Sequence, residues 1–158
     1  MRLTQLTDYS YRMLIFLAAT APRQATIREI ASGYGISRNH LMKVANLLAR
    51  HGFVRAARGR SGGLTLARPA AEIVLGDVAR KLEGDFGLVE CMGNGSHCRI
   101  EAACNLKPLF ARAVDAFLGV LDAATLADLV RQPQALTLLL ERPARGEPPA
   151  QKFTRAAQ

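Results

Sequence analysis

The sequence predicts a mainly α-helical fold with a small β wing, made of a winged helix-turn-helix domain and a long dimerisation helix. Three observations predict this fold class. Two capped helical segments are separated by a glycine turn within residues 26–52, and the second carries an apolar stripe. Two short strand patterns then flank a basic, glycine-rich segment at 58–63, and a wide apolar helical stripe follows at 105–121. The first two features are typical of folds that place one helix and a β hairpin against a duplex.

The first helix is predicted to start at Thr7 and to run to about Ala19, with Pro22 just beyond its end. Thr7 is the predicted N-cap, because a hydroxyl at that position can accept a bond from a backbone N–H of the first turn. Asp8 then lies in the first turn, where the helix dipole favours a carboxylate. Its spacing to Arg12 also suits an ion pair one turn along the helix.

A capping box predicts the second helix. Thr26 supplies the N-cap hydroxyl and Glu29 the carboxylate three positions later. Gly33 and Gly35 are expected to end this helix, because glycine tolerates the left-handed conformation found at helix C-termini. Ser37 caps the next helix, so the two helices are joined by a tight turn.

The third helix is predicted from Ser37 to Gly52 and has two distinct faces. One face is apolar at i, i+3, i+4 and i+7 and should be buried: Leu41, Val44, Ala45 and Leu48. The opposite face is polar, with spacings of four, three and four: Asn39, Lys43, Asn46 and Arg50. Asn can pair with adenine edges and Lys can reach guanine or phosphate. With Arg38 and His40 near the helix start, this face is a candidate DNA-reading surface; a merely solvated face is the alternative.

Residues 53–57 and 64–66 are predicted as strands joined by a basic hairpin, Arg58-Gly59-Arg60-Ser61-Gly62-Gly63. Glycine lets the backbone approach another surface closely, and arginines can enter a narrow minor groove or clamp phosphates. Arg58, Arg60 and Ser61 are therefore candidate DNA contacts. Neither a GxxxxGK[ST] nor a GxGxxG pattern is present, so a nucleotide-binding loop is disfavoured.

Positive charge is concentrated in the first part of the chain. Residues 1–70 hold eleven Lys and Arg residues but only Asp8 and Glu29 as acids, whereas the remainder is nearly neutral. Nucleic acid is the commonest partner for such a field. A membrane surface is the alternative, but the charges fall on several elements rather than along one amphipathic helix.

The second part of the chain is predicted to connect and dimerise. It contains a possible third strand at 73–75 and a short helix at 76–82. The next helix, at 105–121, bears a stripe too wide for one small domain to cover: Leu106, Leu109, Phe110, Ala113, Val114, Phe117, Leu118 and Leu121. A second copy could cover it, and Thr125 caps a last short helix. The expected organisation is a DNA-binding domain (1–75), a connector and cysteine loop (76–104), dimerisation and closing helices (105–140) and a disordered tail (141–158).

All three cysteines of the chain lie within fourteen positions, at Cys91, Cys98 and Cys104. The polar, glycine-containing loop between them favours a metal site over buried packing, and the absence of CxxC disfavours a thiol redox pair. A zinc site could add His97, although its neighbour Cys98 makes shared ligation awkward. An iron-sulfur cluster usually takes four ligands. The fourth must come from another residue type, a small molecule or another subunit.

The cysteine count also bears on the compartment. Three clustered cysteines do not suit a disulfide framework, so the chain is expected to be cytoplasmic. The stretch from Met13 to Ala21 resembles the apolar part of a secretory signal, but its nine residues are too few for a membrane span, which needs about 20. A DNA-binding regulator, not an enzyme, is the expected class.

Four segments together resemble the iron-sulfur winged-helix regulators that include IscR, and among them the nitric-oxide-sensing NsrR repressors. They are residues 3–9 (LTQLTDY), 37–44 (SRNHLMKV), 58–63 (RGRSGG) and the three-cysteine loop, and the resemblance spans about residues 1–130. It implies a homodimer that binds operator DNA, represses genes for nitric oxide detoxification, and releases DNA when nitric oxide attacks a bound cluster.

The same resemblance implies a ligand set. The three cysteines would bind a [4Fe-4S] cluster, with Asp8 of the partner subunit as the fourth ligand. In the IscR-like branch a histidine three positions after the last cysteine ligates a [2Fe-2S] cluster, but Lys107 stands there in this chain, so that cluster is disfavoured. The alternatives are an iron-sulfur assembly or iron-responsive regulator of the same family, and a zinc-stabilised or thiol-redox DNA-binding protein.

Overall fold

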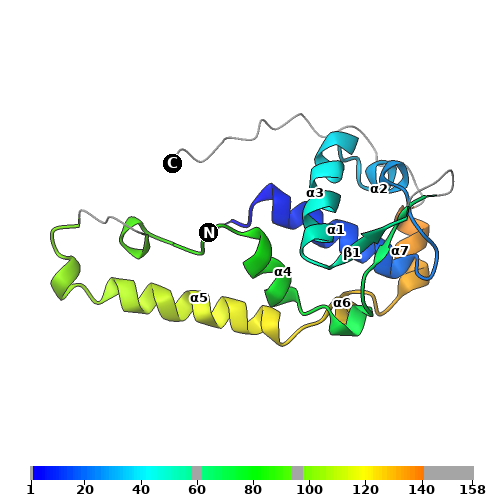
Figure 1. The fold of residues 1–158 in the computed structure, drawn as a ribbon. Helices are drawn as coiled ribbons and strands as arrows, with labels where there is room; N and C mark the ends of the chain where they lie inside the picture. The colour runs from blue at the N-terminus through cyan, green and yellow to red at the C-terminus, as the bar shows by residue number, and fades with distance from the viewer. Residues whose placement is uncertain (1, 58–61, 94–97, 141–158) are drawn as a thin grey trace.

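The computed structural model describes residues 2–57, 62–93 and 98–140 of the chain. Its elements are α1 (Gln5–Ala19), α2 (Ile27–Tyr34), α3 (Arg38–Arg50), β1 (Val54–Ala56), β2 (Leu64–Leu66), η1 (Ala70–Glu72), α4 (Leu75–Leu82), η2 (Glu90–Met92), η3 (Glu101–Ala103), α5 (Leu106–Asp122), α6 (Leu126–Leu129) and α7 (Pro133–Leu140). Figure 1 shows α1 to α4 gathered at one end, with α5 extending away from them. We call the described residues from 2 to 82 the front unit and those from 83 to 122 the arm.

The front unit has a continuous hydrophobic core built from the predicted stripes. Buried side chains of α1 meet those of α3, α2, β1 and α4 in one cluster, which includes Leu14, Ile30, Leu41, Phe53 and Val78. These five side chains are at most 1% exposed. Burying a large apolar side chain contributes roughly 1.5–3 kcal/mol, so this cluster is the main source of stability in the front unit.

The first helix begins earlier than predicted, and Thr7 is not its N-cap. Thr4 holds that position, and its hydroxyl accepts a hydrogen bond from the Thr7 backbone N–H. The reason is tertiary: the Glu83 carboxylate accepts bonds from the backbone N–H and the hydroxyl of Thr4, at 2.8 and 3.1 Å. Thr7 is instead fully buried inside α1.

The predicted helix-turn-helix is confirmed, with one change. The capping box of Thr26 and Glu29 is present, and Ser37 accepts a bond from a first-turn N–H of α3. Gly35 ends α2 in the left-handed conformation, with φ 62°. Gly33 does not end α2 but lies within it, where the missing Cβ admits the Leu140 carbonyl of α7; a Cβ there would lie 2.8 Å from that oxygen.

The wing is a two-stranded antiparallel sheet in which Val54 pairs with Leu66 and Ala56 with Leu64. The predicted third strand at 73–75 is wrong. That segment pairs instead with the turn before α6, through Leu75 N–H to Ala124 O and Leu126 N–H to Ile73 O. The backbone there is extended but bonds to a different partner, and α4 begins at once.

The C-terminal helices return to the front unit. Thr125 and Asp128 form a capping box at α6, as the predicted cap requires, and Leu126 is fully buried. A further helix, α7, was not predicted; it packs against α1 and α2, and the Thr137 hydroxyl donates to the Ala19 carbonyl at 3.2 Å. The four-part domain division stays a prediction, and the tail at 141–158 lies outside the described residues. None of the described helices is long and apolar enough to cross a membrane.

Candidate DNA-binding face and cysteine segment

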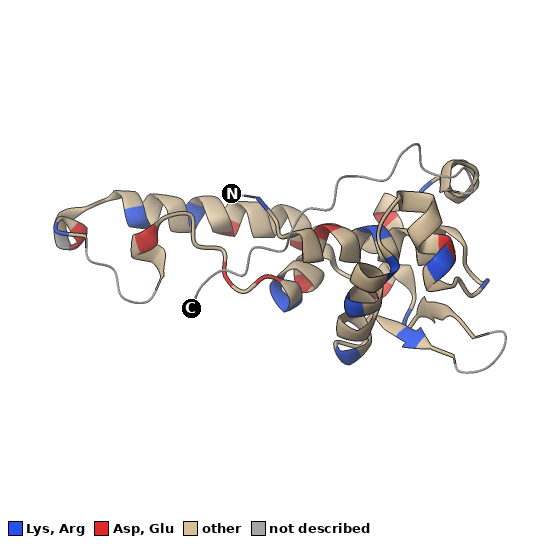
Figure 2. Ribbon diagram, turned by 90° about the horizontal axis from the view of Figure 1, so that it is seen from above, with Lys and Arg blue, Asp and Glu red and all other residues tan. Residues whose placement is uncertain are grey.

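The polar face of α3 is directed outward because the other face is held in the core. Five of the residues predicted on it are exposed: Arg38, Asn39, Lys43, Asn46 and Arg50. The buried stripe of Leu41, Val44, Ala45 and Leu48 fixes this orientation, since residues three and four positions apart share one side of a helix. Figure 2 shows basic residues recurring along α3 and on the neighbouring strand. The helix therefore presents amide and cationic groups of the kind that read base edges.

His40 differs from the other predicted contacts because it turns toward α1. Its ring lies 6.2 Å from the ring of Tyr9, and it is partly buried. Tyr9 is fixed in turn by a hydrogen bond from the Gln5 side chain to its hydroxyl, at 2.7 Å. His40 therefore connects α3, whose polar face is the candidate DNA-reading surface, to α1. We call α3 the reading helix.

Asp8 is half-exposed in the first turn of α1 and pairs with Arg12. Two contacts join them, Arg12 Nη2 to Asp8 Oδ2 at 2.9 Å and Nε to Oδ1 at 3.0 Å. The Arg12 guanidinium also lies about 6 Å from the ring centres of Tyr9 and Tyr34. Burial raises the pKa of Tyr34 to about 12, so this phenol stays neutral beside the ion pair. Asp8 is thus linked, through Arg12 and Tyr9, to His40 at the start of α3.

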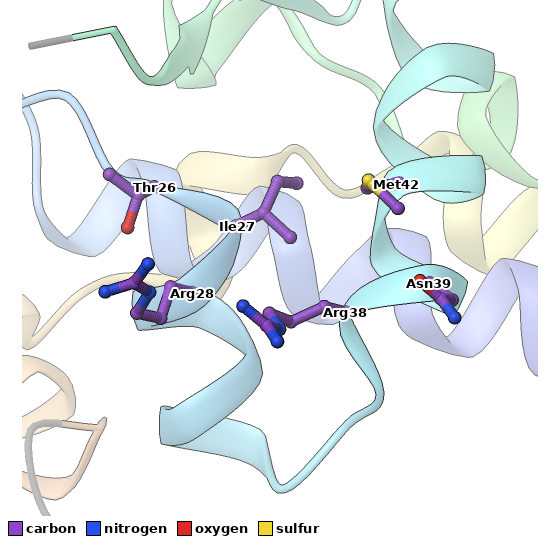
Figure 3. A pocket seen from close by; sticks show the side chains of 6 residues that line it. All are labelled: Thr26, Ile27, Arg28, Arg38, Asn39 and Met42. Carbon is purple, nitrogen blue, oxygen red and sulfur yellow. The ribbon is translucent and has the colours of Figure 1, made fainter. Parts of the chain in front are cut away.

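An open pocket of about 580 Å³ lies between α2 and α3, beside the polar face. It is lined by Thr26, Ile27, Arg28, Arg38, Asn39 and Met42. Figure 3 shows these side chains drawn from the start of α2 and the first turns of α3. Arg28, Ile27 and Met42 were not among the residues predicted for the DNA-reading surface, although they line this pocket beside it. The signal was present for Met42, because it stands outside the buried stripe although it is apolar.

The structure does not describe the tip of the wing, where the predicted wing contacts lie. Arg58, Arg60 and Ser61 lie outside the described residues. Arg55 of β1 is described and exposed, and its guanidinium donates to the Ala67 carbonyl at 2.7 Å. The base of the wing is therefore braced across its two strands.

Two of the three cysteines lie in segments next to α5. Cys104 immediately precedes the helix, and its Sγ accepts a hydrogen bond from the Leu106 backbone N–H at 3.4 Å. Cys91 lies in η2, which packs against α5. Lys107 forms an ion pair with Glu101 at 2.6 Å. The pKa of Lys107 is raised mainly by this bond, and a smaller effect comes from Cys91. Helix N-termini favour negative groups, so this end of α5 suits thiolate ligands.

The cysteine donor set fits a metal centre chemically, although the described residues of one chain do not assemble it. All three cysteines are free thiols and none is buried; Cys98 is exposed. Three soft sulfur donors suit iron-sulfur or zinc chemistry. Among the described residues, however, no group of three His, Cys, Asp or Glu side chains is positioned to hold a metal ion. The predicted fourth ligand, Asp8, belongs to the front unit and is paired with Arg12.

The arm leaves apolar surface uncovered. Leu106, Leu109 and Val120 of α5 are 45%, 56% and 71% exposed, whereas Val114 is buried. α5 is anchored at its other end, where Asp122 receives a bidentate ion pair from Arg80 of α4. A helix face of this kind gains stability when a second surface covers it.

The start of α1 is attached to the connector that leads to the cysteines. Besides the bonds from Thr4 to Glu83, the Tyr11 hydroxyl donates to the Leu75 carbonyl at 2.7 Å. Burial raises the pKa of Tyr11 to about 12, and the charge of Glu83 adds to this effect. The first residue of the arm, Glu83, is therefore hydrogen-bonded directly to the N-cap residue of α1.

Comparison with known proteins places this architecture. The family model described as Rrf2, iron-dependent transcriptional regulator, matches residues 3–132. CymR of Bacillus subtilis, described as the global cysteine regulator, shares 28% identity and a TM-score of 0.67 over 83% of this chain and 97% of its own. The oxidized form of Staphylococcus aureus CymR shares 30% identity and a TM-score of 0.63 over 80% and 93%. IscR of T. potens shares 25% identity and a TM-score of 0.67 over 83% and 87%. The predicted winged-helix fold class is confirmed.

Proposed function

Because this chain belongs to the Rrf2 family of transcriptional regulators, we propose that it is a repressor that binds operator DNA as a homodimer, under control of a nitric-oxide-sensitive iron-sulfur cluster. The observation that carries the proposal is that Cys104 directly precedes α5 and Cys91 lies in a turn packed against that helix, with Cys98 exposed on the same segment. The family's iron dependence favours iron over zinc at these sulfurs. The proposal also places the protein in the cytoplasm.

The proposed ligands are Cys91, Cys98, Cys104 and Asp8 of the partner subunit. The [4Fe-4S] cluster, when bound, supplies iron that reacts with nitric oxide. A carboxylate is a harder donor than thiolate, so Asp8 is the most exchangeable of the four ligands. A [2Fe-2S] centre with Lys107 as a ligand is disfavoured, because that ammonium is bound to Glu101.

Contacts of Asp8 within this chain suggest how its ligation of iron could change the affinity of α3 for DNA. Ligation of the partner's iron by Asp8 would compete with the two hydrogen bonds that its oxygens accept from Arg12. Arg12 also contacts the rings of Tyr9 and Tyr34, and Tyr9 contacts His40 of α3. We expect an exchange of Asp8 from Arg12 to the partner's iron to be transmitted to α3 through these rings. A coupling of ~1–3 kcal/mol between ligand site and reading helix would change operator affinity about 5- to 150-fold.

The first experiment is anoxic purification with iron and sulfide analysis. We expect a straw-brown protein with a broad absorption band near ~400 nm and about four irons per chain. A colourless protein with stoichiometric zinc contradicts the sensor and supports the zinc-stabilised alternative. A two-iron spectrum supports the iron-responsive regulator instead.

The second experiment identifies the operator and the effector. The anoxic protein is used to select duplexes from a randomised pool, and binding of the enriched duplex is measured before and after nitric oxide. We expect affinity to fall by about tenfold or more. Unchanged affinity refutes the switch.

Asp8→Ala tests the fourth ligand, with Asp115→Ala as the matched control, since Asp115 is an exposed acid on α5. Asp8→Ala should retain iron but change the absorption spectrum, whereas the control should match the wild type. An unchanged Asp8→Ala spectrum removes Asp8 from the ligand set.

A further inference from the structure

Met42 is an exposed apolar side chain on the polar face of the reading helix. It is 48% exposed, although every other large apolar residue of α3 is buried or half-buried. A single exposed apolar residue on a surface needs no explanation. Met42, however, lines the pocket between α2 and α3, with Ile27 on the α2 side. Figure 3 shows the Ile27 side chain projecting from α2 into the space toward α3. Together the two side chains form an apolar patch in the pocket.

The same pocket is also basic. Arg28 and Arg38 line it, both are exposed, and in the described part of the chain neither forms an ion pair. Asn39 lies one helical turn before Met42 and adds an amide that can pair with a base edge. The pocket therefore combines two cations, one amide and two apolar side chains. Its occupant should be a polyanion that also exposes a small apolar group.

Duplex DNA offers one apolar group of this kind in the major groove, the C5-methyl group of thymine. Phosphates on both sides of the groove lie within reach of arginine, and their contacts position a protein without reading sequence. We propose that Met42 contacts a thymine methyl group in each operator half-site, that Ile27 lines the α2 side of the same pocket, and that Arg28 and Arg38 bind the flanking phosphates. This inference rests on the proposed function, because it requires α3 to enter the major groove.

Deoxyuridine substitution tests the contact, because deoxyuridine lacks the methyl group and keeps every base-pairing atom. Each thymine of the selected duplex is replaced in turn, in one half-site and then in both. Removing one buried methyl group should weaken binding about fourfold at one position, and about fifteenfold when both half-sites are changed.

Variants assign the effect to Met42. Met42→Ala should bind the thymine and deoxyuridine duplexes equally, and Met42→Leu should recover most of the discrimination. Lys43→Ala is the control; it should bind more weakly but keep the ratio between the two duplexes. Met42 is exposed, so its replacement removes no core contact, and thermal unfolding of the variants checks this.

The outcomes separate the two proposals. A protein that enriches no duplex contradicts the proposed function, and this inference with it. A protein that enriches a duplex but tolerates deoxyuridine everywhere, or whose Met42→Ala variant keeps the wild-type discrimination, overturns this inference alone. An enriched duplex without thymine in its half-sites does the same.

Discussion

The front unit and the arm differ in how far their apolar side chains are buried. In the front unit, side chains from α1, α2, α3, β1, β2 and α4 close one core, and Leu14, Ile30 and Leu41 are completely buried. In the arm, Val114 is the one side chain of α5 that is buried, and Leu106 and Leu109 are exposed. The cysteine segment forms only two short 3₁₀ turns, η2 and η3, within its described residues.

This difference shows which part of the molecule can be complete within one chain. The front unit, with α6 and α7 packed against it, closes its core within one chain. The arm has unburied apolar residues and free thiols, and both features call for something beyond a single chain. On the proposed function, a partner subunit and a metal centre would complete the arm, and DNA binding could be regulated there without unfolding α3.

The largest effect that tests this comparison is expected from a core truncation. Leu14→Ala should lower the free energy of unfolding by about 2–5 kcal/mol, because it leaves a cavity among side chains that cannot collapse into it. Urea denaturation measures the loss, which should be the same at low and high protein concentration. A loss below about 1 kcal/mol would show that the front unit is not the stable part.

The next effect concerns the uncovered face of α5. Leu109→Asp should weaken self-association by about 2 kcal/mol per copy, because it places a charge where a leucine would be buried between two subunits. Sedimentation at several concentrations measures the dissociation constant. Ala111→Asp is the control, since Ala111 is exposed on α5 but outside the apolar stripe. Equal behaviour of the two variants would place the dimer interface elsewhere.

A smaller effect is expected from the helix caps of the front unit. Thr26→Ala removes the hydroxyl that bonds the Glu29 backbone N–H at 3.2 Å, and should cost about 1 kcal/mol. Chemical denaturation measures it. Thr26→Ser provides the control because it retains the hydroxyl. If both variants lose the same stability, the capping bond is not the cause.

The smallest effect is a pH dependence at the same cap. Partial burial raises the pKa of Glu29, but hydrogen bonds from Thr26 and Arg23 outweigh it and hold the pKa below the ordinary value of 4.5. A carboxyl with a depressed folded-state pKa stabilises the fold above its unfolded value, and this stability is lost as pH falls through the folded value. Urea midpoints between pH 6 and pH 3 should therefore fall less in Glu29→Gln than in the wild type. If the urea midpoints of Glu29→Gln and the wild type fall equally with pH, protonation of Glu29 does not contribute to the loss of stability in acid.

Local signals in the sequence were sufficient for most of the front unit. A capping box, a serine cap and a glycine turn depend on neighbouring residues, so Thr26, Ser37 and Gly35 could be placed without the fold. The buried stripe of α3 follows from its period in the same way. The exposed polar face opposite that stripe was predictable for the same reason.

The features that the sequence did not reveal depend on residues far apart in the chain. Thr4 rather than Thr7 caps α1 because Glu83 bonds to it, 79 positions away. Residues 73–75 were predicted as a possible third strand, but they bond to the turn before α6. Helix α7 has few local signals, and its place is set by α1, α2 and the space at Gly33.

The candidate site divides along the same line. The sequence by itself determined the composition of the reading face and the clustering of three sulfur donors, because both are periodic or local features of the chain. The ion pair between Asp8 and Arg12 was predictable from its spacing. Only the tertiary structure placed Met42 and Ile27 in one basic pocket and brought Arg12 to Tyr34 of α2 and Tyr9 to His40 of α3. Side chains from different helices meet only where packing brings the helices together, and a one-dimensional pattern does not record that meeting.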